Sequence, residues 1–115
     1  MRIVVKNGSD VTGRVDCMLV ISRFQADDSF EDEGGRVVEF WKDKPGCVAV
    51  RLVRNLDEPG LWAIVSEWDN VGAYRRAFQG YDAKMLLTPI LSRAIDEPSA
   101  YMDPSELGAN VPRET

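Results

Sequence analysis

The side chains that most often carry chemistry in proteins are scarce in this chain. It contains no histidine and only two cysteines, Cys17 and Cys47. Without histidine the chain has no Ser-His-Asp or Cys-His nucleophile and no histidine site for zinc or haem. Two cysteines are too few for a cysteine zinc or iron–sulfur site. The acidic run of Asp27, Asp28 and residues 31–33 is typical of a charged helix start, so we predict no metal site.

Composition is that of an ordinary globular protein. The 115 residues are 44% hydrophobic and 29% charged, which suits a single domain with one core. The net charge of −5 disfavours a nucleic-acid partner, because phosphate binding needs a basic surface. No apolar run is long enough to span a membrane, and Lys6, Asn7 and Gly8 stand where a signal peptide would be apolar. We therefore expect a cytoplasmic protein, which so few cysteines also favour.

Hydrophobic patterning predicts one organised domain over residues 17–102. An N-terminal extension, 1–16, precedes it and could add one edge strand, and a mobile polar tail, 103–115, follows it. Within the domain, turn residues separate runs that are rich in Val, Leu and Ile. The predicted strands are 17–24, 47–55, 61–68 and 99–102.

Two helical regions join these strands. The first has Ser29 as its predicted N-cap and stops at Pro45-Gly46. The second begins at Asp69 or Asn70, which serves as its N-cap, and is interrupted at Gly80. A last helical piece over 82–87 follows, and Pro89 bends or ends it.

The order strand, helix, strand, strand, helix, strand is the ferredoxin-like plan, an α+β fold. Its two split βαβ units (βαββαβ) form an antiparallel sheet with the helices on one face. Right-handed crossovers place the first strand in the middle, beside the third and fourth, and the second strand at an edge. Cys17 and Cys47 then lie about 10 Å apart across an intervening strand. This is too far for a disulfide, so we expect two inert, packed thiols.

The first three strands are apolar on both faces, unlike a sheet with one solvated side. On the third strand, Trp62, Ile64 and Trp68 share a face. On the second, we place Cys47 on the same face as Ala49 and Val53. Because the helices cover only one face, the other would expose a large apolar patch, to which we assign both tryptophans.

We therefore predict a homodimer in which two sheets pack face to face, forming a dimeric α+β barrel. A pocket would remain where side chains fail to fill the space between the sheets. The alternative is that Trp62 and Trp68 only fill a core or an interface.

Three segments of the chain resemble one known family. They are residues 40–52 around Pro45-Gly46, residues 65–75 from Val65 to Arg75, and residues 97–101. They look like the helix–turn–strand junction, the strand-ending Trp with its capped helix, and the last strand of the antibiotic biosynthesis monooxygenase family, whose members are dimeric α+β barrels. The resemblance covers about residues 17–102, and it implies the fold more specifically than the activity.

The resemblance implies roles for several residues. Trp68 and Tyr74 match the family's catalytic aromatic pair. Ile64 stands where members that oxidise polyketides carry an asparagine, and Ser22 is the nearest match to an asparagine on the first strand of other members. The family's pocket arginine has three candidates: Arg75, Arg76 and Arg93. Haem-degrading members need a histidine, so that activity is disfavoured here.

The activity that the resemblance implies is oxidation of an aromatic phenol or quinol by O2 without a cofactor. Phe24, Trp62 and Trp68 would form stacking walls, with Ile64 beside them, while Ser22 and Tyr74 would hydrogen-bond the substrate oxygens. The alternative for Tyr74 is a helix residue packed on the sheet, and for Ser22 a small residue tolerated at an interface. The alternative for the protein is a non-catalytic small-molecule-binding or assembly protein on the same barrel.

Overall fold

Four strands form one antiparallel sheet in the computed structural model, which describes residues 17–105. The strand order β2-β3-β1-β4 confirms the predicted crossovers, with the first strand between the third and the fourth. The suggested edge strand in residues 1–16, and residues 106–115 of the predicted tail, lie outside the described residues. The strands are β1 (Met18–Gln25), β2 (Cys47–Arg54), β3 (Leu61–Trp68) and β4 (Ala100–Met102).

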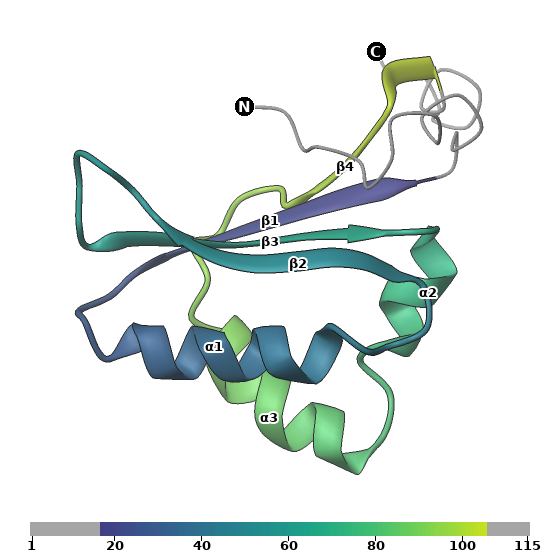
Figure 1. The fold of residues 1–115 in the computed structure, drawn as a ribbon, viewed down its shortest axis with the longest axis horizontal. Coiled ribbons are helices and arrows are strands. Elements are labelled where there is room, and N and C mark those ends of the chain that lie inside the picture. Colours follow the sequence, from purple (N-terminus) through teal and green to yellow (C-terminus); the bar gives the residue numbers. More distant parts are fainter. Residues whose placement is uncertain (1–16, 106–115) are drawn as a thin grey trace.

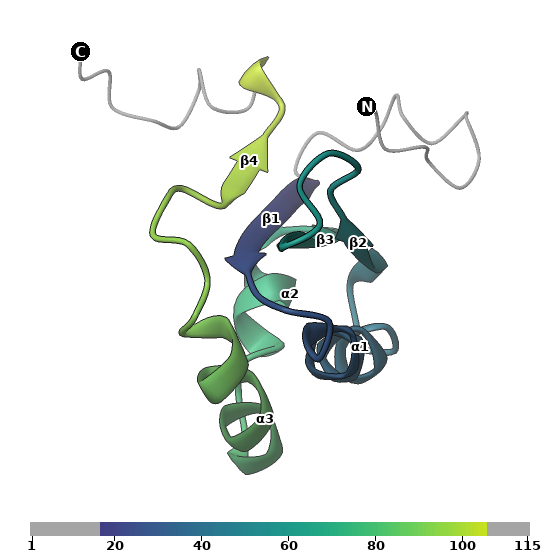
Figure 2. The same cartoon turned by 90° about the vertical axis from the view of Figure 1, so that its left-hand side faces the viewer.

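The three helices between residues 30 and 91 lie on one side of the sheet (Figure 1), which confirms the ferredoxin-like α+β fold. Figure 2 shows α1 beneath the β2 side of the sheet and α3 beneath the opposite side. Each helix of residues 17–105 is too short or too polar to cross a membrane. The helices are α1 (Phe30–Trp41), α2 (Val71–Arg76) and α3 (Tyr81–Leu91).

Alternation along β3 defines the covered face of the sheet. Trp62, Ile64, Ser66 and Trp68 are all buried, with Trp68 fully so (0% exposed). Both tryptophans therefore lie under the helices, and our assignment of them to the uncovered face was wrong. Alternation identifies the residues that share a face, but it does not say which face the helices cover.

A β-bulge corrects a second assignment. The pairing of β2 with β3 shifts register between Cys47 and Ala49, so that Cys47 lies opposite Trp68 and Ala49 opposite Glu67. An extra residue in one strand reverses the alternation beyond it. Cys47 therefore packs against the core, on the opposite face of β2 from Ala49. Our prediction that the two residues share a face was wrong. Because β3 separates β2 from β1, Cys47 and Cys17 are not joined to each other, as predicted.

Close packing explains Gly34, the first of the two adjacent glycines of α1, but not Gly35. A Cβ on buried Gly34 would lie 2.8 Å from Leu52 Cδ1, whereas one on Gly35 would meet nothing within 4 Å. Gly34 therefore allows α1 to approach β2, which offsets its low helix propensity.

The second helical region begins as predicted but ends later. The Asn70 side chain accepts a hydrogen bond from the Ala73 amide (2.8 Å) and caps α2. Pro89 lies inside α3, which continues to Leu91 instead of ending before the proline. The last turn carries buried Ile90, so core packing there offsets the hydrogen bond that a proline cannot donate.

Candidate functional site

Four aromatic rings form a cluster where α1, α2 and the end of β3 meet. Trp41 of α1 packs edge-on against Trp68 of β3, with ring centroids 5.5 Å apart. Tyr74 of α2 lies 5.5 Å from the Trp68 ring and 5.0 Å from the Phe78 ring. Edge-to-face pairs of this kind are favourable because ring edges are positive and ring faces negative. The cluster thus fixes the position of the Tyr74 ring.

The indole N–H groups of this cluster differ in their surroundings. Trp68 Nε1 donates to Ser66 Oγ (2.9 Å). Trp41 Nε1 is buried and has no hydrogen-bond partner among the described residues. The cluster therefore retains one buried donor that the sheet and helices leave unsatisfied.

A cavity of about 190 Å³ adjoins this cluster. It lies within one chain at the edge of β1, between that strand, the region of Tyr74 and Phe78, and the segment before β4. Trp68 is not part of its wall but contacts Tyr74, which is. Nine residues line it: Ile21, Ser22, Tyr74, Phe78, Leu91, Ala94, Ile95, Glu97 and Ser99.

The cavity brings together Ser22 and Tyr74, the two hydroxyl residues that sequence analysis selected. Neither side-chain hydroxyl makes a hydrogen bond to another residue of the described part of the chain. Burial raises the pKa of the Tyr74 phenol above its ordinary value, because a phenolate would lose hydration. Tyr74 is therefore a hydrogen-bond donor at neutral pH, and both hydroxyls are available to a ligand.

Glu97 supplies the cavity with a carboxylate. Its Oε2 accepts from Arg23 Nε (2.7 Å) and its Oε1 from Arg23 Nη2 (2.8 Å), a bidentate ion pair between β1 and the segment before β4. The hydrogen bonds from Arg23 hold the pKa of Glu97 below its ordinary value, so the group stays ionised at neutral pH. Arg23 itself does not line the cavity.

Phe24 and Trp62, two of the predicted stacking residues, form a separate cluster with Phe30. The Phe30 ring lies 4.6 Å from Phe24 and 5.7 Å from Trp62. Neither Phe24 nor Trp62 lines the cavity. Trp62 is six residues from Trp68, or about 20 Å along an extended strand, so the two tryptophans do not share one binding site.

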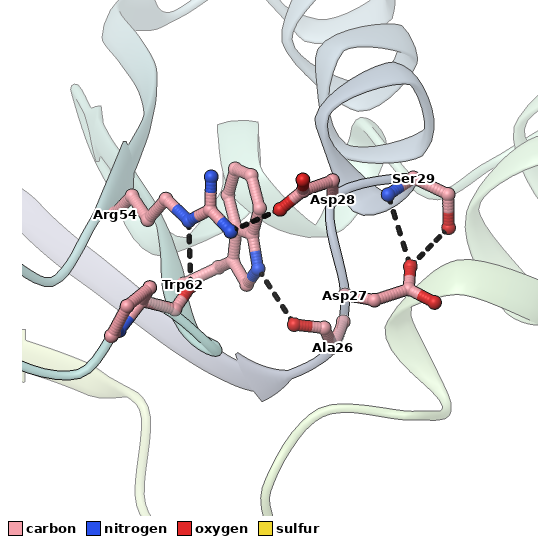
Figure 3. A network of polar contacts seen from close by, with 7 residues as sticks. Ala26, Asp27, Asp28, Ser29, Arg54 and Trp62 are labelled. Carbon is pink, nitrogen blue, oxygen red and sulfur yellow. Dashed lines mark hydrogen bonds and ion pairs between the residues drawn. The ribbon is translucent and has the colours of Figure 1, made fainter.

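A polar network covers the second cluster (Figure 3). The Arg54 guanidinium lies 4.2 Å from the centre of the Trp62 ring, and it donates to Pro59 O (2.6 Å) and to the Asp28 carboxylate. Trp62 Nε1 donates to Ala26 O (3.1 Å). These contacts tie β2 and β3 to the loop before α1, which is a structural role.

The remaining predicted residues do not reach the cavity. Ile64 is buried in the core beneath the helices (1% exposed). Of the arginine candidates, Arg75 and Arg76 are exposed and Arg93 pairs with Glu33 of α1. The described lining thus carries no arginine.

Sequence analysis missed Glu97 and the segment around it as site residues. The segment 94–99 runs along the edge of β1, where backbone bonds from Ile21 N to Ser99 O (2.8 Å) and from Ile95 N to Arg23 O (2.8 Å) hold it. No local pattern marks such a segment. Phe78 could have been predicted as a site residue, because it lies four residues after Tyr74 and so on the same helical face.

Comparisons of the sequence and the fold with known proteins point to one family. Residues 23–84, more than half of the chain, match the sequence model of the family described as antibiotic biosynthesis monooxygenase. No curated protein matches the sequence.

Several solved structures share the fold. SnoaB, a cofactor-independent oxygenase from Streptomyces nogalater, is 23% identical with a TM-score of 0.66, and the match covers 76% of this chain and 93% of that one. A conserved protein from Methanosarcina mazei Go1 is 17% identical with a TM-score of 0.66, covering 81% and 98%. Rv0793 from Mycobacterium tuberculosis is 12% identical with a TM-score of 0.61, covering 76% and 94%. From the extent of the sequence match, the chain belongs to the antibiotic biosynthesis monooxygenase family, as its residues predicted.

Proposed function

We propose that this protein is a cofactor-independent monooxygenase that oxidises a small aromatic phenol or quinol with O2. The observation that carries the proposal is the pair of hydroxyls of Ser22 and Tyr74, which bond to no other residue of 17–105 and lie in one partly apolar cavity. A cavity of about 150 Å³ holds benzene, so about 190 Å³ suits one or two rings. The name of SnoaB, whose fold this chain shares, supports the reaction class.

The reaction needs no external reductant. For a phenol with a free para carbon, the hydroxyl hydrogen leaves as a proton and an electron that both pass to O2, and the resulting phenoxyl and hydroperoxyl radicals join at that carbon. Loss of water then gives the quinone: one oxygen atom becomes the new carbonyl, and the other leaves with two hydrogens, one from the ring carbon and one from the hydroxyl. The substrate supplies all the electrons.

The chain would contribute orientation and exclusion of water. Tyr74, kept protonated by burial, would donate to a substrate oxygen, and Ser22 would donate or accept beside it. Phe78 and Leu91 are the apolar walls that would keep water from the oxygenated intermediate. Trp68 would act through Tyr74 by holding its ring, as their 5.5 Å separation suggests.

The proposed assembly is a homodimer formed by the uncovered sheet face. That face carries Leu19, Ile21, Ala63 and Val65, which lie opposite the helices and are only partly buried in one chain. A second copy of the sheet would cover these side chains.

One observation favours the alternative, a binding or assembly protein without catalysis. Ile64 fills with an apolar side chain the place where the family resemblance implies a polar one, and it is fully buried. A binding protein needs the cavity but no group at that place.

Turnover under air decides between these functions. A panel of hydroxynaphthalenes is incubated with the protein, and quinone absorbance is followed against the spontaneous rate. The monooxygenase predicts a rate above background that Trp68→Phe lowers at least about tenfold, a typical cost of misplacing a reactive geometry. Phe30→Leu, a core change in the other aromatic cluster, is the matched control and should keep the rate.

Binding of a naphthol without turnover of any compound in the panel would favour the binding protein. Unchanged turnover in Trp68→Phe would remove Trp68 from the site. Haem titration is expected to give no specific Soret band.

A further inference from the structure

We propose that Glu97 makes the cavity selective for uncharged aromatic compounds with a hydroxyl group and excludes aromatic carboxylates. This inference rests on the proposed function, because it assumes that the cavity beside Tyr74 is the substrate site. It assigns a role to the segment before β4, which the proposed reaction leaves without one.

The arrangement of the ion pair gives the cavity a negative wall. Glu97 is the one charged residue among the nine that line the cavity, whereas its partner Arg23 is not part of the lining. The bidentate contact with Arg23 Nε and Nη2 holds the carboxylate in place. The negative end of the pair is therefore the end nearer to a ligand.

This wall treats ligands differently according to their charge. Each carboxylate oxygen of Glu97 accepts one bond from Arg23 and keeps a second lone pair, which can accept a bond from a ligand hydroxyl. A ligand carboxylate has no proton to donate at neutral pH and would meet a like charge with no cation in the lining to offset it. The hydroxyls of Ser22 and Tyr74 would bind the ligand's other oxygen.

Three probes of similar size measure this selectivity: 1-naphthol, 1-naphthoate and 1-naphthylmethylammonium, neutral, anionic and cationic at neutral pH. Their dissociation constants are measured by calorimetry. Because burial disfavours any ion, the diagnostic quantity is the change in these constants between variants and not their ratio in one protein.

Two variants break the same ion pair with opposite effects on charge. Glu97→Gln removes the negative group, so naphthoate should bind about tenfold tighter, and the ammonium probe should bind more weakly. Arg23→Gln leaves the carboxylate and removes its counter-charge, so both effects should reverse. Glu33→Gln, which breaks the Arg93 pair away from the cavity, is the matched control and should change neither constant.

The outcomes separate this inference from the proposed function. Opposite shifts in Glu97→Gln and Arg23→Gln support it, whatever the turnover assay shows. Equal shifts in both variants would mean that only the structure of the segment matters, and would overturn it while leaving the proposed function standing. Failure of 1-naphthol to bind the unmodified protein would overturn both.

Discussion

The indole of Trp68 is fixed by a residue of its own strand: Trp68 Nε1 donates to Ser66 Oγ at 2.9 Å. The two residues are two positions apart and so share the covered face of β3. Ser66 is also a buried polar residue in a face otherwise made of Trp62, Ile64 and Trp68 (1% exposed). It thereby holds the ring against which Tyr74 packs.

Replacement of Ser66 by Ala should destabilise the fold by about 1–3 kcal/mol, because it leaves the Trp68 N–H buried without an acceptor. Urea unfolding measures the loss. The control is Ser22→Ala, which removes a hydroxyl that bonds to no other described residue, and should cost within about 0.5 kcal/mol. Equal losses in the two variants would mean that the Ser66–Trp68 bond contributes nothing specific.

The element order and sheet order followed from the sequence because they depend on local signals. Turn residues, Asn70 as a cap and the alternation of β3 are all read within a few positions, and right-handed crossovers then leave few topologies. The same local signals do not determine which elements pack against each other in space. Which face of β3 the helices cover, and so where Trp62 and Trp68 lie, is decided by contacts between elements.

The candidate site was predictable only in part for the same reason. Ser22 and Tyr74 do share a cavity, but Glu97 reaches it through a long-range pairing with β1 that no spacing encodes. Phe24 and Trp62 were grouped with Trp68 because all are aromatic. Strand length, however, separates the start of β3 from its end.

The adjacent glycines of α1 should respond differently to alanine. Gly35→Ala should stabilise the protein by up to about 1 kcal/mol through helix propensity, since a Cβ there meets nothing. Gly34→Ala would bring a methyl to 2.8 Å from Leu52 Cδ1 and should be less stable than Gly35→Ala by about 1–3 kcal/mol. Thermal unfolding compares them. If Leu52→Val, added to Gly34→Ala, restored nothing, the Leu52 contact would not be the cause.

The Arg54 network should affect stability and leave ligand binding alone. Arg54→Gln removes the cation above the Trp62 ring and should cost about 1 kcal/mol in chemical unfolding. Because the network lies over the Phe24–Phe30–Trp62 cluster, the dissociation constant of 1-naphthol should stay unchanged in calorimetry. If a folded Arg54→Gln variant bound 1-naphthol with a higher dissociation constant, Trp62 would have to be part of the binding site.

The Arg23–Glu97 pair should make stability depend on pH in the acidic range. The folded-state pKa of Glu97 lies below its ordinary 4.5, so the pair stabilises fully above that value and loses its effect as pH falls through the folded-state pKa. The unfolding free energies of the wild type and Glu97→Gln should differ at neutral pH and converge in acid. In the double variant, Arg23→Gln should add little to Glu97→Gln. A difference that did not depend on pH would show that the carboxylate's charge is irrelevant.

The protonation of Tyr74 provides a test of its proposed role as a donor. Burial raises its pKa above the ordinary 10.0, so the folded state keeps a proton that the unfolded state loses, and stability should fall as pH rises above that value. The tyrosinate absorbance of the wild type, minus that of Tyr74→Phe, isolates this one titration. We expect its midpoint above 10.0, with turnover lowered in Tyr74→Phe. A midpoint near neutral pH would instead make the phenolate accessible there, and Tyr74 would then act as a base toward the substrate hydroxyl, not as a donor.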